Sequence, residues 1–332
     1  LQDLETAYFR CLCLSALPTL LSAAATSFFT GRGDSRTVLL INVTGLAVNA
    51  LTAAALIFGM WGFPALGIVG AGLATVLGTS TSAVLALLLM LQARYRKTHA
   101  TASGWRFDGE LFRRLMRFGL PNGVFAALDV LSFTIFLQLI GRLGEVDLIV
   151  TTIAFTLNLV VYFPMLGIGQ AVEVLVGQRL GEDRPALAER TTWRGLWLAL
   201  AYAFAAALAY ILLPETLAGL FHGVHDDELW EPIRTRVPVL LRFVAVYSLF
   251  DSMNILFSNA LRGAGDTRFV TWAALILSWP IMVLPTEAAL AYGWDLYWAW
   301  AFASGYIILL ALTFWFRFRQ GKWRSMRVIE SH

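Results

Sequence analysis

The sequence predicts an all-α integral membrane protein with two helical lobes. Of its 332 residues, 58% are hydrophobic and only 14% are charged, a smaller charged share than soluble domains usually have. Apolar runs near the length that crosses hydrocarbon recur along the chain. A motif also repeats roughly 230 positions later, each time between two apolar runs, which indicates two homologous bundles. The two copies are Gly31-Arg-Gly-Asp-Ser-Arg36 and Arg262-Gly-Ala-Gly-Asp-Thr-Arg268.

Nine apolar runs, separated by Gly, Pro or charged residues, predict nine spanning helices. A chain in lipid must satisfy its backbone hydrogen bonds internally, so runs of this length form helices. In chain order, the predicted helices are residues 4–29, 37–60, 67–93, 119–140, 148–178, 191–213, 238–261, 269–291 and 296–318.

Basic residues gather on one side of the predicted membrane. Most of the 25 Lys and Arg residues fall in the loops of that side, whereas the longest loop opposite is acidic from Asp226 to Glu231. The basic side is therefore cytoplasmic. We expect a multi-pass protein of the inner cell membrane with a cytoplasmic C-terminus. The net charge of +3 then describes topology and gives no reason to expect a nucleic-acid partner.

Residues 94–118 form the longest basic stretch between predicted helices. We interpret it as a cytoplasmic linker that lies partly on the membrane surface, with an ordinary loop as the alternative. It would join residues 1–93, the remainder of an N-terminal lobe with three helices, to residues 119–332, a six-helix lobe with a short basic tail. If the lobes are repeats, about three further helices at roughly 20 residues each would precede the chain, giving twelve.

Two acidic residues lie deep in predicted helices. Asp129 is about ten residues into its helix and Asp251 about thirteen into its own, so at about 1.5 Å per residue both lie near mid-bilayer. A carboxylate there costs roughly 2.5 to 3.5 kcal/mol on insertion scales, which indicates function or structural hydrogen bonding between helices. Tyr247 precedes Asp251 by four residues and shares its helix face.

Three stretches together resemble the multidrug and toxic compound extrusion (MATE) family. They are the hairpin Ala260 to Arg268, the run from Pro164 to Gly181, and Phe118-Gly-Leu-Pro121 opening a helix. The similarity covers the whole chain and corresponds to helices four to twelve of the family's twelve. It implies a MATE-type two-lobe bundle acting as a secondary antiporter, which exports organic, often cationic, compounds in exchange for Na⁺ or H⁺. We expect a monomer in contact with membrane lipid and no other cofactor.

The pattern Tyr247-x-x-x-Asp251, with Asp129 on the first helix of the lobe, resembles the cation site of the NorM-like branch of that family. There the first-helix position is commonly Glu, so Asp129 is a departure that leaves the ion open. Carboxylate and hydroxyl oxygens suit a hard cation such as Na⁺. They equally suit a proton relay.

Other polar residues are weaker candidates for the cavity. Asn158 is at a depth similar to that of the two acids, and Asn42 and Asn49 are stacked seven apart on the second helix. For these three, hydrogen bonding between helices is the competing interpretation. Glu173, near the cytoplasmic end of its helix, is a candidate for the cavity mouth or a partner of Arg179.

Two alternatives come from other classes. A lipid-linked oligosaccharide or polysaccharide flippase of the same superfamily would need basic residues in the cavity for the pyrophosphate, whereas the deep charges here are acidic. A membrane enzyme would need His, Cys or clustered carboxylates at one membrane face, and the deep acids lie on separate helices instead.

Overall fold

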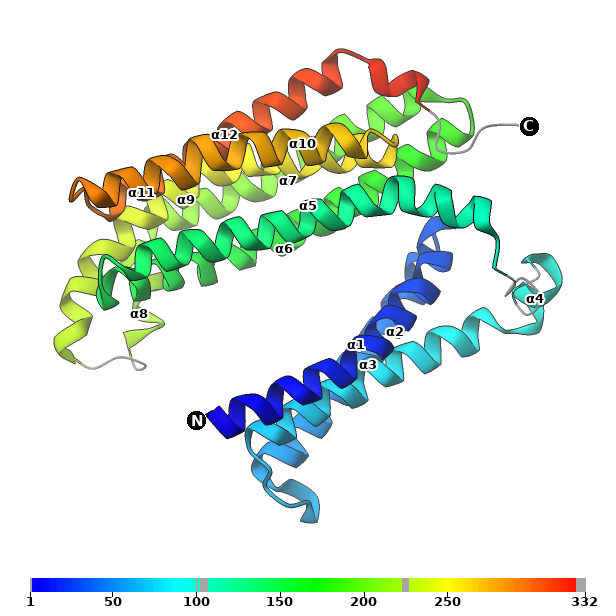
Figure 1. Cartoon of the computed structure of the whole chain (residues 1–332), viewed down its shortest axis with the longest axis horizontal. Coiled ribbons are helices and arrows are strands. Elements are labelled where there is room, and N and C mark those ends of the chain that lie inside the picture. The colour runs from blue at the N-terminus through cyan, green and yellow to red at the C-terminus, as the bar shows by residue number, and fades with distance from the viewer. Residues whose placement is uncertain (1, 100, 102–106, 223–226, 327–332) are drawn as a thin grey trace. The chain divides into compact units, whose positions relative to one another are not determined.

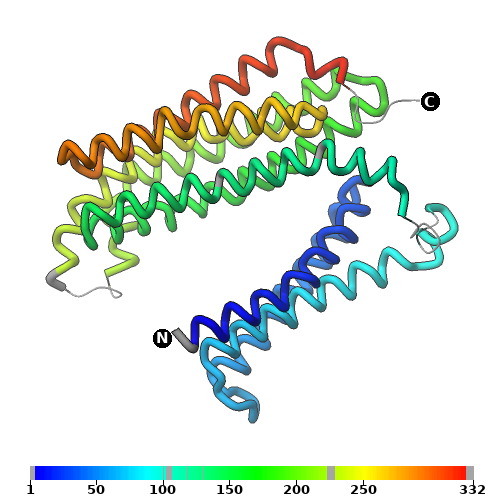
Figure 2. Tube along the Cα trace, viewed as in Figure 1, coloured from blue at the N-terminus to red at the C-terminus, as the bar shows by residue number. Residues whose placement is uncertain are grey.

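The computed structural model of this chain describes every residue except 1, 100, 102–106, 223–226 and 327–332, which are grey in Figure 2. The side chains of residues 2, 3, 118, 129, 227 and 228 also lie outside the described part. Within these limits, nine helices are long and apolar enough to cross a membrane, so the predicted all-α membrane fold is confirmed. The chain divides into two compact units, residues 1–108 and residues 109–332.

The first unit is organised around one helix. Both α1 (Gln2–Gly31) and α2 (Ser35–Phe58) pack along α3 (Ile68–Met90), as Figure 1 shows in blue and cyan. Small residues allow this approach, because a Cβ added to Gly78 would lie 2.6 Å from the Cβ of Asn49. The unit also contains η1 (Met60–Gly62) and α4 (Ala93–His99).

In the second unit the central helix is α9 (Asp227–Gly263). It packs against α6 (Glu145–Gly181), α7 (Pro185–Leu212) and α12 (Leu296–Arg319). Its spanning segment is the most buried of the nine, so polar side chains on α9 are largely removed from solvent. The other elements are α5 (Gly109–Gly141), α8 (Pro214–Gly219), α10 (Thr267–Ser278), η3 (Trp279–Val283), α11 (Leu284–Ala291) and η4 (Lys322–Ser325).

A proline inside α6 is accommodated by hydroxyl groups of α7. Pro164 has no N–H for the carbonyl of Val160, and the Tyr202 hydroxyl donates to that oxygen at 2.8 Å. One turn earlier, the Tyr210 hydroxyl donates to the Leu157 carbonyl at 2.8 Å. Both bonds tie α7 to α6, and the bond from Tyr202 replaces the donor that Pro164 lacks.

The two copies of the repeated motif form hairpin turns that use their aspartates differently. Gly33 and Gly265 have φ of 74° and 93°, which glycine adopts without a Cβ penalty. Asp34 caps α2 by accepting from the Thr37 N–H at 3.3 Å and from the Thr37 hydroxyl at 2.8 Å. Asp266 makes no such cap bond and accepts instead from Nε of Arg317 at 2.7 Å.

The largest departures from the predicted helix starts are those of α5 and α9, which both begin earlier than predicted. Residues 109–118, which we expected in the linker, form the first turns of α5, and Pro121 lies inside this helix instead of opening it. The physical reason is the amphipathic spacing of apolar and basic residues between Leu111 and Arg117, which favours a helix at a membrane surface. Likewise, α9 begins at Asp227 and not at Pro238.

Candidate functional site

The best-defined polar site lies on α9, around Tyr247 and Asp251. Both side chains are buried, with exposed fractions of 3% and 7%. Four residues apart on one helix, they share a face, and the two groups lie close enough to interact electrostatically. The Asn254 side chain, three residues further along, donates from Nδ2 to Oδ1 of Asp251 at 3.1 Å. A carboxylate, a phenol and an amide are therefore brought together inside the second unit.

Aromatic rings wall one side of this site. The rings of Tyr247 and Trp300 are 6.4 Å apart, and Trp300 stacks on Phe155 of α6 at 5.0 Å. The indole Nε1 of Trp300 donates to Oγ1 of Thr151 at 3.2 Å, which fixes the ring. Since Trp300 is 1% exposed, this wall excludes solvent and fixes the position of the Tyr247 ring.

Asp129 is a residue of α5, but its side chain lies outside the described part of the chain. Its predicted pairing with Asp251 therefore stays a prediction. In the part of the chain that the structure describes, no three His, Cys, Asp or Glu side chains form a group that could hold a metal ion. An ion at Asp251 would consequently need oxygen ligands of other kinds, such as those of Tyr247 and Asn254.

Asn158 of α6 lies near the aromatic wall. It is half-buried, one turn beyond Phe155, and its Oδ1 atom is buried without a hydrogen-bond donor among the described residues. A buried amide oxygen without a donor is costly in protein interiors. Asn158 thus offers an uncharged oxygen without a donor among the described residues, and its role in the cavity stays a prediction.

Glu173 occupies a different part of α6. It is half-buried and lies close enough to Arg262 of α9 for the two charges to interact. Arg179, a predicted partner of Glu173, instead binds Glu182 at 2.8 Å. The backbones meet here, because a Cβ added to Gly263 would lie 2.2 Å from the carbonyl oxygen of Glu173. Glu173 and Asp251 are not brought together in the contacts that the structure describes.

In the first unit, the two predicted asparagines of α2 have different surroundings. Asn49 is half-buried and packs on Gly78 of α3, consistent with interhelical packing. Asn42 is exposed in this structure. A role of either asparagine in the cavity stays a prediction.

Sequence analysis missed further buried polar residues on α9. Ser252 donates to the Met165 sulfur at 3.1 Å, and Asn259 donates from Nδ2 to the Ile255 carbonyl at 2.7 Å. Ser248 and Ser258 are also buried. The available signal was the series Tyr247, Asp251, Asn254 and Ser258, whose spacing of three or four residues along a spanning helix marks a polar stripe on one face.

The chain is similar to known transporters over most of its length. The MatE family model matches residues 121–286. The chain is 30% identical over 319 residues to the probable multidrug resistance protein NorM of Mesorhizobium japonicum, an alignment that covers 93% of this chain and 67% of that protein. It is 27% identical over 289 residues to the probable multidrug resistance protein NorM of Brucella suis, with 87% and 61% covered.

The chain thus spans about three fifths to two thirds of the length of the curated relatives it matches. Among solved structures, the outward-facing conformation of a multidrug resistance MATE family transporter of the MOP superfamily matches with a TM-score of 0.85. The sequence identity is 19%, and the match covers 97% of this chain and 70% of that chain. This likeness supports the fold.

Proposed function

The chain belongs to the MatE family, and from this membership we propose that the whole protein is a secondary active multidrug efflux antiporter. It exports small organic, often cationic, compounds in exchange for Na⁺ or H⁺. The names of its relatives as multidrug resistance proteins support the substrate class. The nine candidate spans in the described residues agree with a transporter of the membrane and not with a soluble enzyme.

One observation carries the proposal, namely the buried carboxylate of Asp251 beside Tyr247. An acid buried in a spanning helix has a high insertion cost and usually serves an ion or proton pathway. In the proposed mechanism, Asp251 binds the coupling ion directly, and the Tyr247 hydroxyl and Asn254 amide supply neutral oxygen ligands. Asp129 of α5 provides the second carboxylate of the same site.

Export is coupled to ion entry because the coupling ion and a cationic substrate compete for the same negatively charged carboxylates. When Na⁺ or H⁺ occupies the carboxylates, their negative charge is neutralised, and a cationic substrate loses its electrostatic attraction. Asn158, whose Oδ1 atom has no donor among the described residues, is the uncharged group that we assign to substrate or ion contact. The stacked rings of Trp300 and Phe155 lie beside this site, and aromatic faces attract organic cations.

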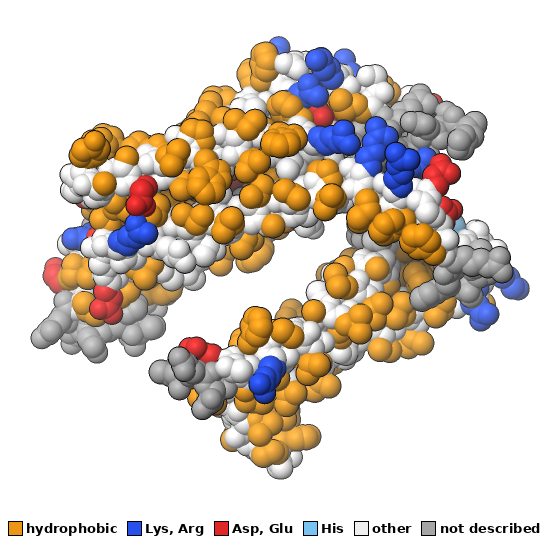
Figure 3. Space-filling view, in the orientation of Figure 1, with side chains coloured by type: hydrophobic (Ala, Val, Ile, Leu, Met, Phe, Trp, Pro, Cys, Tyr) orange, Lys and Arg blue, Asp and Glu red, His pale blue; other side chains and the backbone are white. Residues whose placement is uncertain are grey.

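The orientation of the proposed transporter follows from its arginines. Hairpin residues Arg32 and Arg268 are exposed, and Lys and Arg side chains gather at the end of the second unit where α12 finishes, blue in Figure 3. By the positive-inside rule we place both hairpins and the end of the second unit where α12 finishes in the cytoplasm. The segment 94–118 and the C-terminus lie on the same side. We further propose that the protein lies in the inner membrane and acts as a monomer.

Transport by the full-length protein in proteoliposomes tests this function, with sodium and proton gradients imposed separately. We expect one gradient alone to drive export of an organic cation such as ethidium. With sodium coupling, Tyr247→Phe removes an oxygen ligand and raises the sodium concentration for half-maximal export. Transport that persists with neither gradient would contradict secondary antiport.

A further inference from the structure

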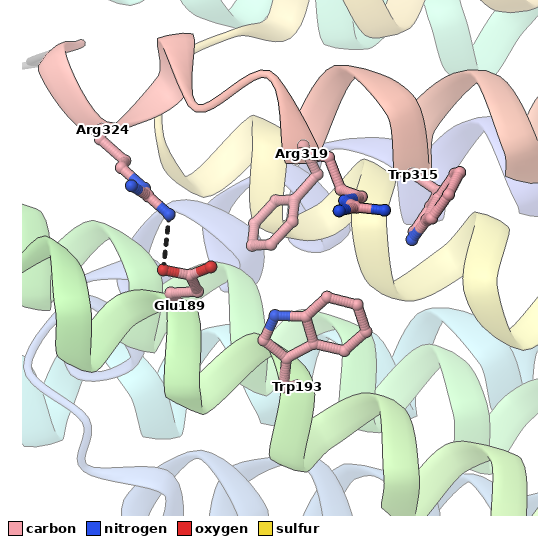
Figure 4. A pocket seen from close by; sticks show the side chains of 6 residues that line it. Glu189, Trp193, Trp315, Arg319 and Arg324 are labelled. Atoms are coloured by element: carbon pink, nitrogen blue, oxygen red, sulfur yellow. Dashed lines mark hydrogen bonds and ion pairs between the residues drawn. The ribbon is translucent and has the colours of Figure 1, made fainter.

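A cavity separate from the candidate cation site lies between α7 and α12. Its volume is about 370 Å³, within the range of small-ligand sites. Figure 4 shows its side chains converging from the N-terminal part of α7, from the C-terminal end of α12 and from the turn after it. The lining residues are Glu189, Trp193, Trp315, Phe318, Arg319 and Arg324.

The floor of the cavity is aromatic and fixed. The Trp193 ring lies 5.7 Å from Phe257 of α9, and Phe257 lies 5.2 Å from Phe318. Trp323 stacks under Phe318 at 4.7 Å and donates through Nε1 to the Phe318 carbonyl at 2.8 Å. Because Phe257 and Trp323 are fully buried, this floor gives the cavity a shape that does not depend on mobile surface side chains.

The side chains that line the cavity carry more positive than negative charges. Glu189 accepts from Nη2 of Arg324 at 2.7 Å, which pairs one carboxylate with one guanidinium. The guanidinium of Arg319 lies 5.1 Å from the centre of the Trp315 ring and makes no ion pair with any described residue. The cavity therefore holds two guanidinium groups and one carboxylate, an arrangement that favours an anion with several oxygen atoms.

The surroundings of the cavity are those of a lipid-facing surface. One turn further into the membrane lie Trp197 of α7, 70% exposed, and Leu312 of α12, 41% exposed. Tryptophan is enriched where head groups meet hydrocarbon. Basic pockets between spanning helices on the cytoplasmic side are typical sites for anionic lipid head groups.

We propose that this cavity binds the phosphate-bearing head group of an anionic phospholipid from the cytoplasmic leaflet of the membrane. Arg319 and Arg324 bind the phosphate oxygens, the rings of Trp193 and Trp315 pack against the glycerol, and the acyl chains run along Trp197 and Leu312. A free phosphate group would meet the same guanidinium groups, but it would leave the adjoining apolar surface unused. The assignment to the cytoplasmic leaflet rests on the orientation proposed above. Lipid binding at the cavity does not require that the protein transports anything.

Native mass spectrometry of the full chain in uncharged detergent tests the site, with phosphatidylglycerol and phosphatidylcholine as lipid probes. We expect phosphatidylglycerol to bind in preference to phosphatidylcholine. Arg319→Gln should weaken phosphatidylglycerol binding about fivefold, as expected for one basic residue at an anionic head group. Its control is Arg268→Gln, which removes the same charge from an exposed position outside the cavity and should leave binding unchanged.

A second variant changes binding in the opposite direction. Glu189→Gln releases Arg324 from its carboxylate and should strengthen phosphatidylglycerol binding. Its matched control is Glu182→Gln, which breaks the ion pair with Arg179 outside the cavity and should have no effect. Binding unchanged in both cavity variants would overturn the proposal. Complete displacement of the lipid by inorganic phosphate would overturn it as well, because the site would then recognise phosphate alone. Neither readout requires export, so failure here is distinct from failure of the proposed antiport.

Discussion

Arg317 binds Asp266 at one end of the second unit, with Nε of the arginine 2.7 Å from Oδ2 of the aspartate. The side chains are only 16% and 8% exposed, and the guanidinium also lies 4.6 Å from the centre of the Phe269 ring. The pair ties the end of α12 to the turn between α9 and α10. Its counterpart in the first unit, Asp34, bonds only within its own hairpin among the described contacts.

Asp266→Ala should destabilise the protein by about 3 kcal/mol, because it leaves Arg317 largely buried without its carboxylate. The measurement is equilibrium unfolding in detergent. Glu287→Ala is the control, since it breaks an ion pair with Arg142 whose two side chains are more than half exposed. Such exposed pairs contribute at most about 1 kcal/mol. Equal losses in the two variants would contradict a stabilising role specific to Asp266.

Asp34 should give the first hairpin a stability that depends on pH. The hydrogen bonds from the Thr37 hydroxyl and backbone N–H hold the pKa of the Asp34 carboxyl below its ordinary value. Its contribution is therefore complete above the unfolded-state pKa, about 3.9, and is lost as pH falls through the lower folded-state pKa. Thr37→Val should raise the pKa of Asp34 towards the ordinary value, as carboxyl ¹³C NMR would show. An unchanged titration would mean that the cap does not set this pKa.

Gly263→Ala should force α6 and α9 apart. The added Cβ would lie 2.2 Å from the Glu173 carbonyl oxygen, a backbone atom that cannot move away cheaply. Overpacking of this kind costs about 1 to 3 kcal/mol, measurable as a lower unfolding midpoint in detergent. Gly167→Ala on α6 is the matched control, because a Cβ there meets nothing within 4 Å. Comparable midpoints for the two variants would show that the close approach is not required.

The two hairpins should be accessible from the same side of the membrane. Single cysteines at Arg32 and Arg268, in a background without Cys11 and Cys13, should react with a membrane-impermeant maleimide only when the cytoplasmic face is open to it. This follows from the distribution of basic residues. Labelling of the two cysteines from opposite faces would contradict both the orientation and the repeat.

The hairpins and spanning helices were predictable from sequence because residues close together in the chain determine them. A Gly-Asp turn between apolar runs specifies its own geometry, and Gly33 and Gly265 both adopt the positive φ that this turn requires. The start of α5 was placed too late because Pro121 was taken as a helix start, whereas the amphipathic segment before it is already helical. A single proline is weak evidence for a helix boundary when the segments on both sides of it have a helical pattern.

Contacts between distant helices could not be predicted. Asp266 and Arg317 are 51 residues apart, and Glu189 and Arg324 are 135 apart, so only helix packing brings each pair together. Within one helix more was available. The burial of Asp251 beside Tyr247 agrees with the sequence pattern, but the Asn254 donor three residues away was missed although residues at that spacing are neighbours on a helix. The role of Asp129 stays a prediction.

The central claim is that Asp129 and Asp251 form one coupling site, and gradient-driven export by the full-length Asp129→Asn, Asp251→Asn double variant tests it most directly. Asparagine keeps the size and hydrogen bonding of aspartate and removes the charge, so the variant should stay folded. Asp295→Asn, at an exposed position before α12, is the control and should transport normally. We predict loss of sodium- or proton-driven export in the double variant. Full export by that variant, at normal expression, would contradict the account.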